Sequence, residues 1–349
     1  MNTTRIKVGI IFGGMSAEHD VSLDSALAVY TNIDKNKFEP LLIYINRKGE
    51  WSFTDSEELK QKKFNNSNPN SFIPWESEFI SKSDIDIFFP VLHGPNGEDG
   101  KIQGLFELTK KPFAGAGSLP SQLAMDKAVS KILFKEAGLN VSDYLVFSNN
   151  FKKDIIKETE KSIGYPCFIK PCSLGSSIGI TKAENENELR PGIDLAFKYD
   201  NKIIIEKFIK GREIEVSVMG NSEVKISKPG ELIPSKEFYD YDDKYLLGKT
   251  EFLIPAKLGK TEEEKIKKAA GDAYRSLYLN GFSRVDFFIE KGTEKIIINE
   301  INTIPGFTEI SMFPKLWKIE GISFTELITI LIDYGFEHYK MSSNLSNNL

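Results

Sequence analysis

The segment RVDFFIEKGTEKIIINEIN, residues 284–302, consists of two β-rich runs joined by a Gly-containing turn, and it predicts a pair of neighbouring strands. Arg284 and Asp286 are separated by one residue, as are Glu300 and Asn302, so each pair lies on one face of its strand. If the connecting loop has an odd length, for instance the central Gly-Thr-Glu, Asp286 falls opposite Glu300 and Arg284 falls opposite Asn302. One face of this hairpin then carries all four polar side chains.

These four residues, which we call the polar row, have the composition of a metal and nucleotide site. Two carboxylates and an amide beside a cation suit Mg²⁺ held jointly with nucleotide phosphates better than Zn²⁺, which prefers His or Cys. The alternative is the solvated face of an edge hairpin, and spacing alone does not separate the two. The opposite face is mostly apolar, and the second strand leads into NTIPGF (302–307), a Pro-Gly turn suited to present backbone N–H groups to a reacting centre. This context favours the metal and nucleotide site.

A second ligand-binding loop is indicated upstream by KPCSLGSSIGI, residues 170–180. The stretch follows an apolar run and is rich in Gly and Ser, which suggests contact with phosphate. Its spacing is neither the G-x-x-x-x-G-K-[ST] of a P-loop nor the G-x-G-x-x-G of a dinucleotide fold. Taken alone, the loop therefore indicates only an anion.

Composition limits the function classes. The 349 residues suffice for roughly two or three domains, and 40% hydrophobic residues supply packed cores. A net charge of −5 and a pI near 5.6, without a Lys/Arg block, argue against a nucleic-acid or anionic-membrane surface. The apolar run VGIIF near the N-terminus is too short for a signal segment or membrane span, so we expect a cytoplasmic protein. Cys167 and Cys172 are the only cysteines, which argues against a disulfide framework or a Cys-based metal site.

The predicted elements divide the chain near residues 115–135. Before this boundary, short β-rich runs alternate with helical patterns, which predicts βαβ units and a parallel sheet. Beyond a helix over 122–137, residues 143–255 are richer in strands and suggest antiparallel sheet layered with helices. The other predicted segments are strands at 8–12, 38–45 and 86–92, helices at 21–32, 100–108 and 262–279, and a surface loop at 63–72.

Eight motifs follow one another between about residues 8 and 335. They are GGMSAEHDVSLDSA (13–26), VLHGPNGEDGKIQGL (91–105), AMDKAVSK (124–131), KPCSLGSSIGI (170–180), EKFIKGREIEV (206–216), EFYDYDDKY (237–245), GFSRVDFF (281–288) and NEINTIPGFTEISMFPKLW (299–317). Each is a weak signal alone, but in this order they make the chain resemble the D-alanine-D-alanine ligases, members of the ATP-grasp superfamily. The resemblance implies an enzyme that joins a carboxylate to an amine through an acylphosphate.

The implied fold class is mixed α/β and α+β. An N-terminal parallel α/β domain that binds substrate would precede a two-subdomain ATP-grasp fold that holds ATP between its halves. The expected divisions are the N-terminal domain at 1–125, the central subdomain at 126–213, the C-terminal subdomain at 214–340 and a flexible tail at 341–349.

The resemblance implies that cationic side chains contact the nucleotide phosphates, because the negative charge gathered during phosphoryl transfer has to be offset. The implied phosphate ligands are Lys127, Lys170 and Lys244, with Ser176 and Ser177 in a loop that folds over ATP. Asp286, Glu300 and Asn302 would hold two Mg²⁺ or Mn²⁺ ions that bridge phosphate oxygens.

The implied adenosine contacts begin in the β-rich run KIIIEKFI, residues 202–209. Glu206 would accept from the adenine amino group, backbone groups from Lys207 to Ile209 would complete that edge, and Glu213 would bind the ribose hydroxyls. Without the resemblance, these residues are equally typical of a solvated strand end with alternating charge.

The first substrate site is implied at the strand ends of the N-terminal domain. Glu18 would bind the ammonium of the first D-alanine, at a position where open α/β sheets place ligands. The alternative is an ordinary carboxylate in the first turn of a helix. His93, at another strand end, is expected to orient the carboxylate of the first D-alanine, although a lone His is often structural.

The second substrate site is implied around the polar row. Arg284 would bind the carboxylate of the second D-alanine and, with the Gly306 N–H, stabilise the tetrahedral oxyanion. Ser311 would add a hydroxyl to that carboxylate. Residues 237–250 are expected to form a lid, in which Tyr245 would join a hydrogen-bonded set with Ser176 and Glu18.

The expected activity is ATP-dependent ligation of two D-alanine molecules through D-alanyl phosphate, for peptidoglycan precursors of the cell wall. The resemblance also suggests a homodimer formed through the first domain. The alternatives within the family are D-alanine-D-serine and D-alanine-D-lactate ligases, against which Met312 and Tyr245 argue because other residues tend to occupy these places there. A catalytically silent ATP-binding module would have lost a metal ligand or Lys170, and the sequence retains them all.

Overall fold

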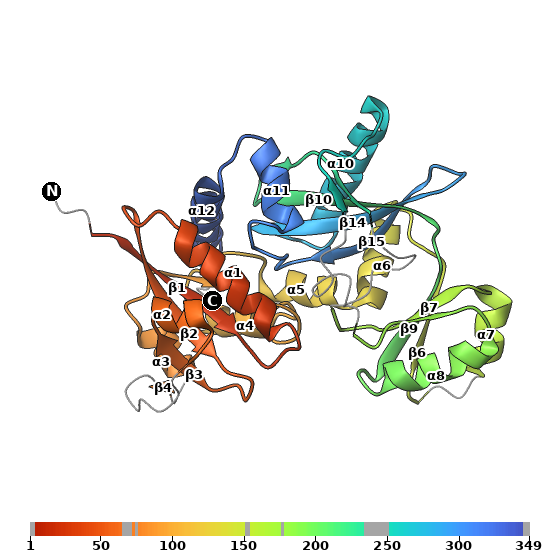
Figure 1. Ribbon diagram of the computed structural model, residues 1–349, viewed down its shortest axis with the longest axis horizontal. Coiled ribbons are helices and arrows are strands. Elements are labelled where there is room, and N and C mark those ends of the chain that lie inside the picture. The colour runs from red at the N-terminus through yellow and green to blue at the C-terminus, as the bar shows by residue number, and fades with distance from the viewer. Residues whose placement is uncertain are drawn as a thin grey trace.

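Three β-sheets organise the part of the chain that the computed structural model describes (Figure 1). The structure describes residues 4–64, 72–73, 76–150, 154–175, 178–233 and 251–344. Residues 65–71 of the surface loop predicted at 63–72 lie outside these residues, and so does the whole lid predicted at 237–250. Within the described ranges, none of the helices has the length and apolarity needed to cross a membrane.

The N-terminal sheet has the strand order β4-β3-β2-β1-β5. Its strands are β1 (Ile6–Gly13), β2 (Phe38–Ile45), β3 (Trp51–Thr54), β4 (Phe72–Ile73) and β5 (Ile87–Pro90). β1 pairs in parallel with both β2 and β5, which confirms the predicted parallel sheet, while β3 and β4 add an antiparallel edge. The carboxyl ends of β1 and β5 therefore lie at the same edge of the sheet.

Helices cover both faces of this sheet. One face packs against α1 (His19–Asn32) and α12 (Phe324–Ser343), whose apolar side chains share one core with β1, β2 and β5. The other packs against α3 (Glu76–Lys82) and α4 (Lys101–Leu108), and α2 (Ser56–Gln61) contacts α1. The C-terminal helix lies in the predicted 214–340 division, and it packs both on the N-terminal sheet and against Phe313 and Trp317 of that division. It also continues to Ser343, into the predicted tail, and the Asn344 N–H closes its last turn by bonding to the Lys340 carbonyl at 3.1 Å.

Gly335 allows α12 to lie close to the sheet, and replacing it by Ala is expected to lower the thermal unfolding midpoint. A Cβ there would lie 2.6 Å from the Phe113 carbonyl oxygen and 2.9 Å from Ile87 Cδ1. Overpacking of this kind costs about 1–3 kcal/mol, which exceeds the gain of about 1 kcal/mol from replacing a helical Gly with Ala. Gly104→Ala in α4 is the control, since its Cβ would meet nothing closer than 4.0 Å. Equal midpoints for the two variants would contradict the close approach of α12.

Two short helices connect the N-terminal sheet to the rest of the chain, where a single helix over 122–137 was predicted. They are α5 (Ser118–Met125) and α6 (Lys127–Glu136). The prediction was wrong because Asp126 is extended and its side chain accepts from the N–H groups of Ala128 and Val129, as an N-cap does. The cap begins a new helix at Lys127.

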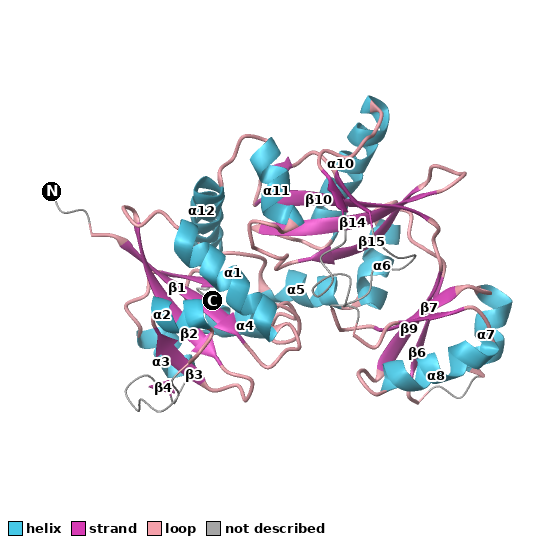
Figure 2. Ribbon diagram, in the orientation of Figure 1, coloured by secondary structure: helices cyan, strands magenta, loops and turns pink. Residues whose placement is uncertain are grey.

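The central sheet is antiparallel, as expected, with the order β6-β9-β7-β8. It contains β6 (Tyr144–Ser148), β7 (Cys167–Pro171), β8 (Thr181–Ala183) and β9 (Lys202–Lys207). Figure 2 shows α7 (Ile155–Ser162) and α8 (Glu186–Phe197) on its outer side. Cys167 and Cys172 are buried free thiols, which agrees with the absence of a disulfide framework.

The third sheet has the order β13-β12-β10-β14-β15, with β11 paired to β10. Its strands are β10 (Gly211–Gly220), β11 (Val224–Ile226), β12 (Gly230–Ile233), β13 (Glu251–Leu253), β14 (Phe282–Glu290) and β15 (Ile296–Asn302). α10 (Lys260–Ser276) packs on the face that carries Val285, Phe287 and Ile289. The polar row, which alternates with these residues, therefore lies on the other face of β14. α11 (Met312–Ile319) contacts β10.

Candidate active site

The polar row is aligned by the pairing of β14 with β15. Arg284 lies opposite Asn302 and Asp286 lies opposite Glu300, so the predicted alignment is confirmed. The odd-length loop on which it rested is wrong, because Glu290 N–H bonds to the Lys295 carbonyl and leaves a loop of even length. The register shifts by one residue beside Asp286, where a β-bulge leaves Asn299 without a partner on β14. Without that extra residue, Asp286 would face Asn299 instead of Glu300.

Arg284 and Asp286 form a forked ion pair within the row. The guanidinium Nε donates to Asp286 Oδ1 at 2.7 Å and Nη2 donates to Oδ2 at 2.7 Å. Asp286 Oδ2 also accepts from Asn302 Nδ2 at 2.9 Å, and Glu215 Oε2 on the neighbouring strand β10 lies 3.1 Å from Arg284 Nε. Burial would lower the pKa of Arg284, but the charges of Asp286 and Glu215 hold it well above its usual range. The row therefore carries a fixed, oriented cation among carboxylates.

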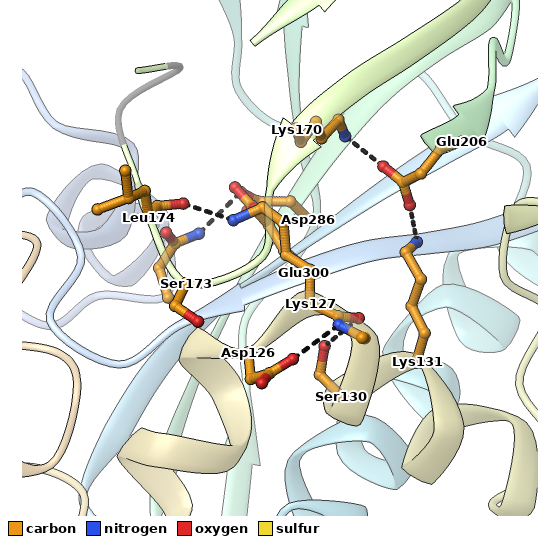
Figure 3. A network of polar contacts seen from close by, with 12 residues as sticks. Asp126, Lys127, Ser130, Lys131, Lys170, Ser173, Leu174, Glu206, Asp286 and Glu300 are labelled. Atoms are coloured by element: carbon orange, nitrogen blue, oxygen red, sulfur yellow. Dashed lines mark hydrogen bonds and ion pairs between the residues drawn. The ribbon is translucent and has the colours of Figure 1, made fainter. Parts of the chain in front are cut away.

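Glu206 lies on the central strand β9 between two lysines, as Figure 3 shows. Lys131 Nζ on α6 lies 2.6 Å from Glu206 Oε1, and Lys170 Nζ on β7 lies 2.5 Å from Oε2. Ser142 Oγ donates to Oε1 at 3.2 Å. Burial would raise the pKa of Glu206, but Lys131 and Lys170 hold it well below its usual value. The carboxylate is charged, and both of its oxygens have partners.

Lys127 connects the two sheets. Its Nζ donates to the Leu174 carbonyl at 2.7 Å, in the loop that follows β7, and lies 3.5 Å from Glu300 Oε2 in the polar row (Figure 3). The Lys127 N–H also donates to the Cys172 carbonyl at 3.0 Å. The start of α6 therefore brings the phosphate-binding loop predicted at 170–180 together with the polar row.

The predicted adenosine residues lie at the same junction. Glu213 on β10 is half-buried, and this burial, with the charge of Asp286, raises its pKa to about 7. Lys207 ends β9, and its N–H is already engaged with the Asp143 carbonyl at 2.9 Å. Ile209 lies in the connection between β9 and β10.

Glu18 lies where β1 leads into α1, and its side chain is 7% exposed. It occupies the N-cap position of α1 without a capping hydrogen bond from its side chain, so helix capping does not explain this residue. Gly94, after β5, has a φ of +74° and a Cβ there would lie 2.7 Å from Glu18 Oε2; a Cβ on Gly175 would lie 3.6 Å from the same oxygen. Gly94 therefore allows the β5 loop to approach this carboxylate, and Gly175 of the 170–180 loop lies at ordinary contact distance from it.

His93 is buried, and both ring nitrogens have protein partners. Its Nε2 lies 2.9 Å from Ser25 Oγ on α1, and its Nδ1 lies 2.9 Å from the Ile304 carbonyl in the Pro-Gly turn. Glu98 Oε1 lies 3.7 Å from Nδ1. These contacts place His93 as a link between the N-terminal domain and the turn that follows the polar row.

The Pro-Gly turn adjoins the start of α11. A Cβ on Gly306 would lie 3.0 Å from Ser311 Oγ, and this hydroxyl accepts from the Thr308 N–H at 3.1 Å. Met312 begins α11 and is buried, with its sulfur 2.7 Å from the position that a Cβ on Gly230 would take. Four other predicted residues lie outside the described residues: Ser176, Ser177, Lys244 and Tyr245.

Two residues of this network were not predicted from the sequence, namely Lys131 and Glu215. Lys131 follows Lys127 by four residues, which places both on one face of α6, so the spacing was an available signal. Glu215 lies opposite Asp286 in the pairing of β10 with β14, which depends on long-range register.

The donor set of the polar row fits a hard divalent cation. Across the ranges that the structure describes, no three His, Cys, Asp or Glu side chains are grouped as a metal cluster. Asp286 and Glu300 supply two carboxylates and Asn302 an amide, which is too few oxygens for an all-protein cage. It suits an ion such as Mg²⁺ that keeps water and shares substrate phosphates.

Known proteins resemble the chain over almost its whole length. The family D-ala D-ala ligase N-terminus matches residues 7–116, and D-ala D-ala ligase C-terminus matches residues 133–333. The D-alanine-D-alanine ligase of Natranaerobius thermophilus is 45% identical over 343 residues, which cover 94% of each chain. That of Bacillus cytotoxicus is 44% identical over 355 residues, which cover 97% of each chain.

Solved structures agree with the same assignment. The VanG D-Ala:D-Ser ligase from Enterococcus faecalis is 37% identical with a TM-score of 0.86, covering 95% of this chain and 100% of that one. The D-alanine-D-alanine ligase from Coxiella burnetii is 29% identical with a TM-score of 0.82, covering 98% of both chains. Since both family segments match in order and relatives at 45% identity span nearly the whole chain, this protein belongs to the D-alanine-D-alanine ligase family and has its ATP-grasp fold.

Proposed function

We propose that the protein joins two D-alanine molecules into D-alanyl-D-alanine with hydrolysis of ATP to ADP and phosphate. The observation that carries the proposal is the approach of Lys127 Nζ to Glu300 Oε2 at 3.5 Å, because it brings the cations of the central sheet to the carboxylates of the third sheet. Family membership supplies the reaction class.

ATP binds, in this proposal, between the central and third sheets. Lys127 and Lys170 contact its phosphates, with Lys244, Ser176 and Ser177 as further contacts from segments outside the described residues. Glu206 and the backbone between Lys207 and Ile209 hold the adenine, and Glu213 holds the ribose. Support comes from the burial of Lys127 and Glu206 and from the electrostatic effect of Lys170, on the central sheet, upon Glu213 of the third sheet.

The polar row would hold the divalent metal through Asp286, Glu300 and Asn302. Two Mg²⁺ or Mn²⁺ ions there would neutralise phosphate charge. Since Asp286 is engaged by Arg284 and Asn302, metal binding would compete with the forked ion pair.

Catalysis proceeds in two steps. The carboxylate of the first D-alanine, whose ammonium is bound by Glu18, attacks the γ-phosphate of ATP in line, and ADP leaves. The amine of the second D-alanine then attacks the acyl carbon of D-alanyl phosphate, and phosphate leaves. Arg284 and the Gly306 N–H stabilise the oxyanion, and Arg284 with Ser311 holds the second carboxylate. His93 acts through the Pro-Gly turn, whose Ile304 carbonyl it contacts.

D-alanine is the preferred second substrate in this proposal. The relatives at 44–45% identity are named D-alanine-D-alanine ligases, whereas the D-Ala:D-Ser ligase is 37% identical. Met312 supports the same choice, because other residues tend to occupy this place in the D-serine and D-lactate ligases. Tyr245, which lies outside the described residues, would join Ser176 and Glu18 in the closed lid.

We further propose a cytoplasmic homodimer that supplies peptidoglycan precursors, with the dimer formed through the N-terminal domain. The proposed divisions remain 1–125, 126–213 and 214–340. The core that α12 shares with β1 and β5 gives residues 324–343 a second attachment, to the N-terminal domain.

A phosphate-release assay tests the activity. Release is expected only when ATP, Mg²⁺ and D-alanine are all present, with D-alanyl-D-alanine as the amino-acid product. D-serine and D-lactate, each offered with D-alanine, test the alternatives. Mixed products formed in preference to D-alanyl-D-alanine would overturn the substrate assignment.

A further inference from the structure

In the cluster of Lys131, Lys170 and Glu206, two lysine ammonium groups share a single carboxylate. Glu206 has one negative charge, and a lysine ammonium contacts each of its oxygens, at 2.6 Å for Lys131 and 2.5 Å for Lys170. The side chains of Lys131 and Glu206 are only 2% and 4% exposed, whereas that of Lys170 is 13% exposed. The surplus positive charge therefore lies with the lysine that is nearer to solvent.

The two lysines differ in how they are held. Lys131 projects from α6, whose start is fixed by the Asp126 cap and by the Lys127 N–H bond to the Cys172 carbonyl. Its ammonium has a second partner in Ser142 Oγ at 3.3 Å, which in turn donates to Glu206. Lys170 is next to the end of β7, where the chain enters the phosphate-binding loop, and Glu300 and Glu213 of the third sheet also act on its charge.

A change of partner by Lys170 would be costly if Glu206 had no other cation. A buried carboxylate left without a counter-ion is strongly destabilising, because it has lost both water and its pair. With Lys131 in place, Glu206 keeps an ion pair and a hydroxyl donor on Oε1 while Oε2 becomes available. The departure of Lys170 then leaves a neutral pair in the interior instead of an isolated charge.

We infer that Lys131 is a positioning residue: it is the fixed counter-ion of Glu206 that allows Lys170 to move from Glu206 to a nucleotide phosphate. The inference rests on the proposed nucleotide site and assigns to it a residue that does not itself contact ATP. The same exchange opens Glu206 Oε2 as an acceptor for the amino group of the base. Phosphate and base binding are thereby coupled through one carboxylate.

The test compares Lys131→Met in the wild-type and Glu206→Gln backgrounds, with MgADP binding measured by calorimetry. In the wild-type background, the substitution is expected to weaken MgADP binding by at least about tenfold, since Lys170 is then the only cation left on a buried charge. In the Glu206→Gln background there is no charge to neutralise, so the same substitution is expected to change the affinity by less than about threefold. In activity assays, the KM for ATP should rise more than kcat falls.

A lysine with a different carboxylate partner provides the matched control. Lys202 lies on the same strand as Glu206 but pairs with Asp126, so Lys202→Met is expected to retain the affinity for MgADP. If Lys131→Met does not fold, Glu206→Gln can still be compared with the double variant. The double variant contains neither the Lys131 ammonium nor the Glu206 carboxylate, so it leaves no unpaired charge from this pair in the interior. The inference is overturned if Lys131→Met lowers the affinity for MgADP equally in both backgrounds. It is also overturned if the double variant binds MgADP far more weakly than Glu206→Gln does. Either result would show that Lys131 acts through packing or on the phosphates directly.

Failure of the proposed function gives a different result. A wild-type protein that binds MgADP but releases no phosphate with D-alanine contradicts the ligase activity and leaves the binding comparison intact. An active wild-type protein whose affinity for MgADP is unchanged by Lys131→Met contradicts only the role of Lys131.

Discussion

Replacing Asp286 by Asn is expected to lower kcat/KM for ATP by about a thousandfold, since metal ions supply several kcal/mol of charge stabilisation and each 1.36 kcal/mol is a factor of ten. Asp286 is held from two sides in the polar row, because it meets Arg284 through both oxygens and also accepts from Asn302. Asn keeps the shape of the side chain but loses the charge that a divalent ion requires. Phosphate release at varied MgATP concentrations measures the effect.

The control for Asp286→Asn is Glu231→Gln, which breaks a fork of the same geometry in the same sheet. Arg212 Nε donates to Glu231 Oε1 at 2.8 Å and its Nη2 donates to Oε2 at 2.7 Å. Both substitutions remove a carboxylate from an Arg pair, so both are expected to lower the thermal midpoint. Only Asp286→Asn is expected to lower activity in the folded enzyme. If activity falls only in proportion to the fraction of unfolded protein, the role of Asp286 is structural.

Arg284→Lys is expected to reduce kcat by roughly 10²–10³-fold, the usual cost of removing one donor to a developing oxyanion. It should also raise the KM for the second D-alanine. Lys keeps the positive charge among Asp286, Glu215 and Glu300 but lacks the planar fork that holds two acceptors at once. Initial rates at varied D-alanine, analysed separately for the two substrate sites, distinguish this outcome from a change in ATP binding.

Arg212→Lys is the corresponding control, because Arg212 forms a fork with Glu231 in the same sheet, away from the polar row. Its kcat is expected to stay at the wild-type level. Similar kinetics for the two variants would mean that Arg284 serves only to balance the buried carboxylates, and the oxyanion role would then be withdrawn.

Local patterns in the sequence predicted the elements that local forces determine. The period of two in the hairpin placed the polar row on one face, and the alternation of strands and helices gave the parallel sheet. The break at Asp126 was also local, since an Asp followed by a good helix former is a capping signal. The 122–137 prediction missed it because the apolar pattern continues across the cap.

Features that depend on distant contacts were not accessible from the sequence. The attachment of α12 to the N-terminal sheet depends on the fit of Gly335 against the Phe113 carbonyl, which no spacing reveals. The partners of Glu206 come from α6 and β7, far apart in the chain, and only the assembled sheet brings them together. Sequence resemblance assigned Glu206 to the base, and the structure adds the ion pairs that such a role has to rearrange.

The β-bulge at Asn299 makes the chemistry of the polar row independent of the exposed hairpin turn. Three pairs lie between the turn and the bulge, ending with Phe287 opposite Ile298, and the functional pairs follow only after it. If the turn lost one residue and kept a four-residue loop, Asn299 would pair with Phe287, the bulge would disappear, and Asp286 would still lie opposite Glu300. A one-residue change in the length of this turn can thus be absorbed by the bulge without moving the polar row.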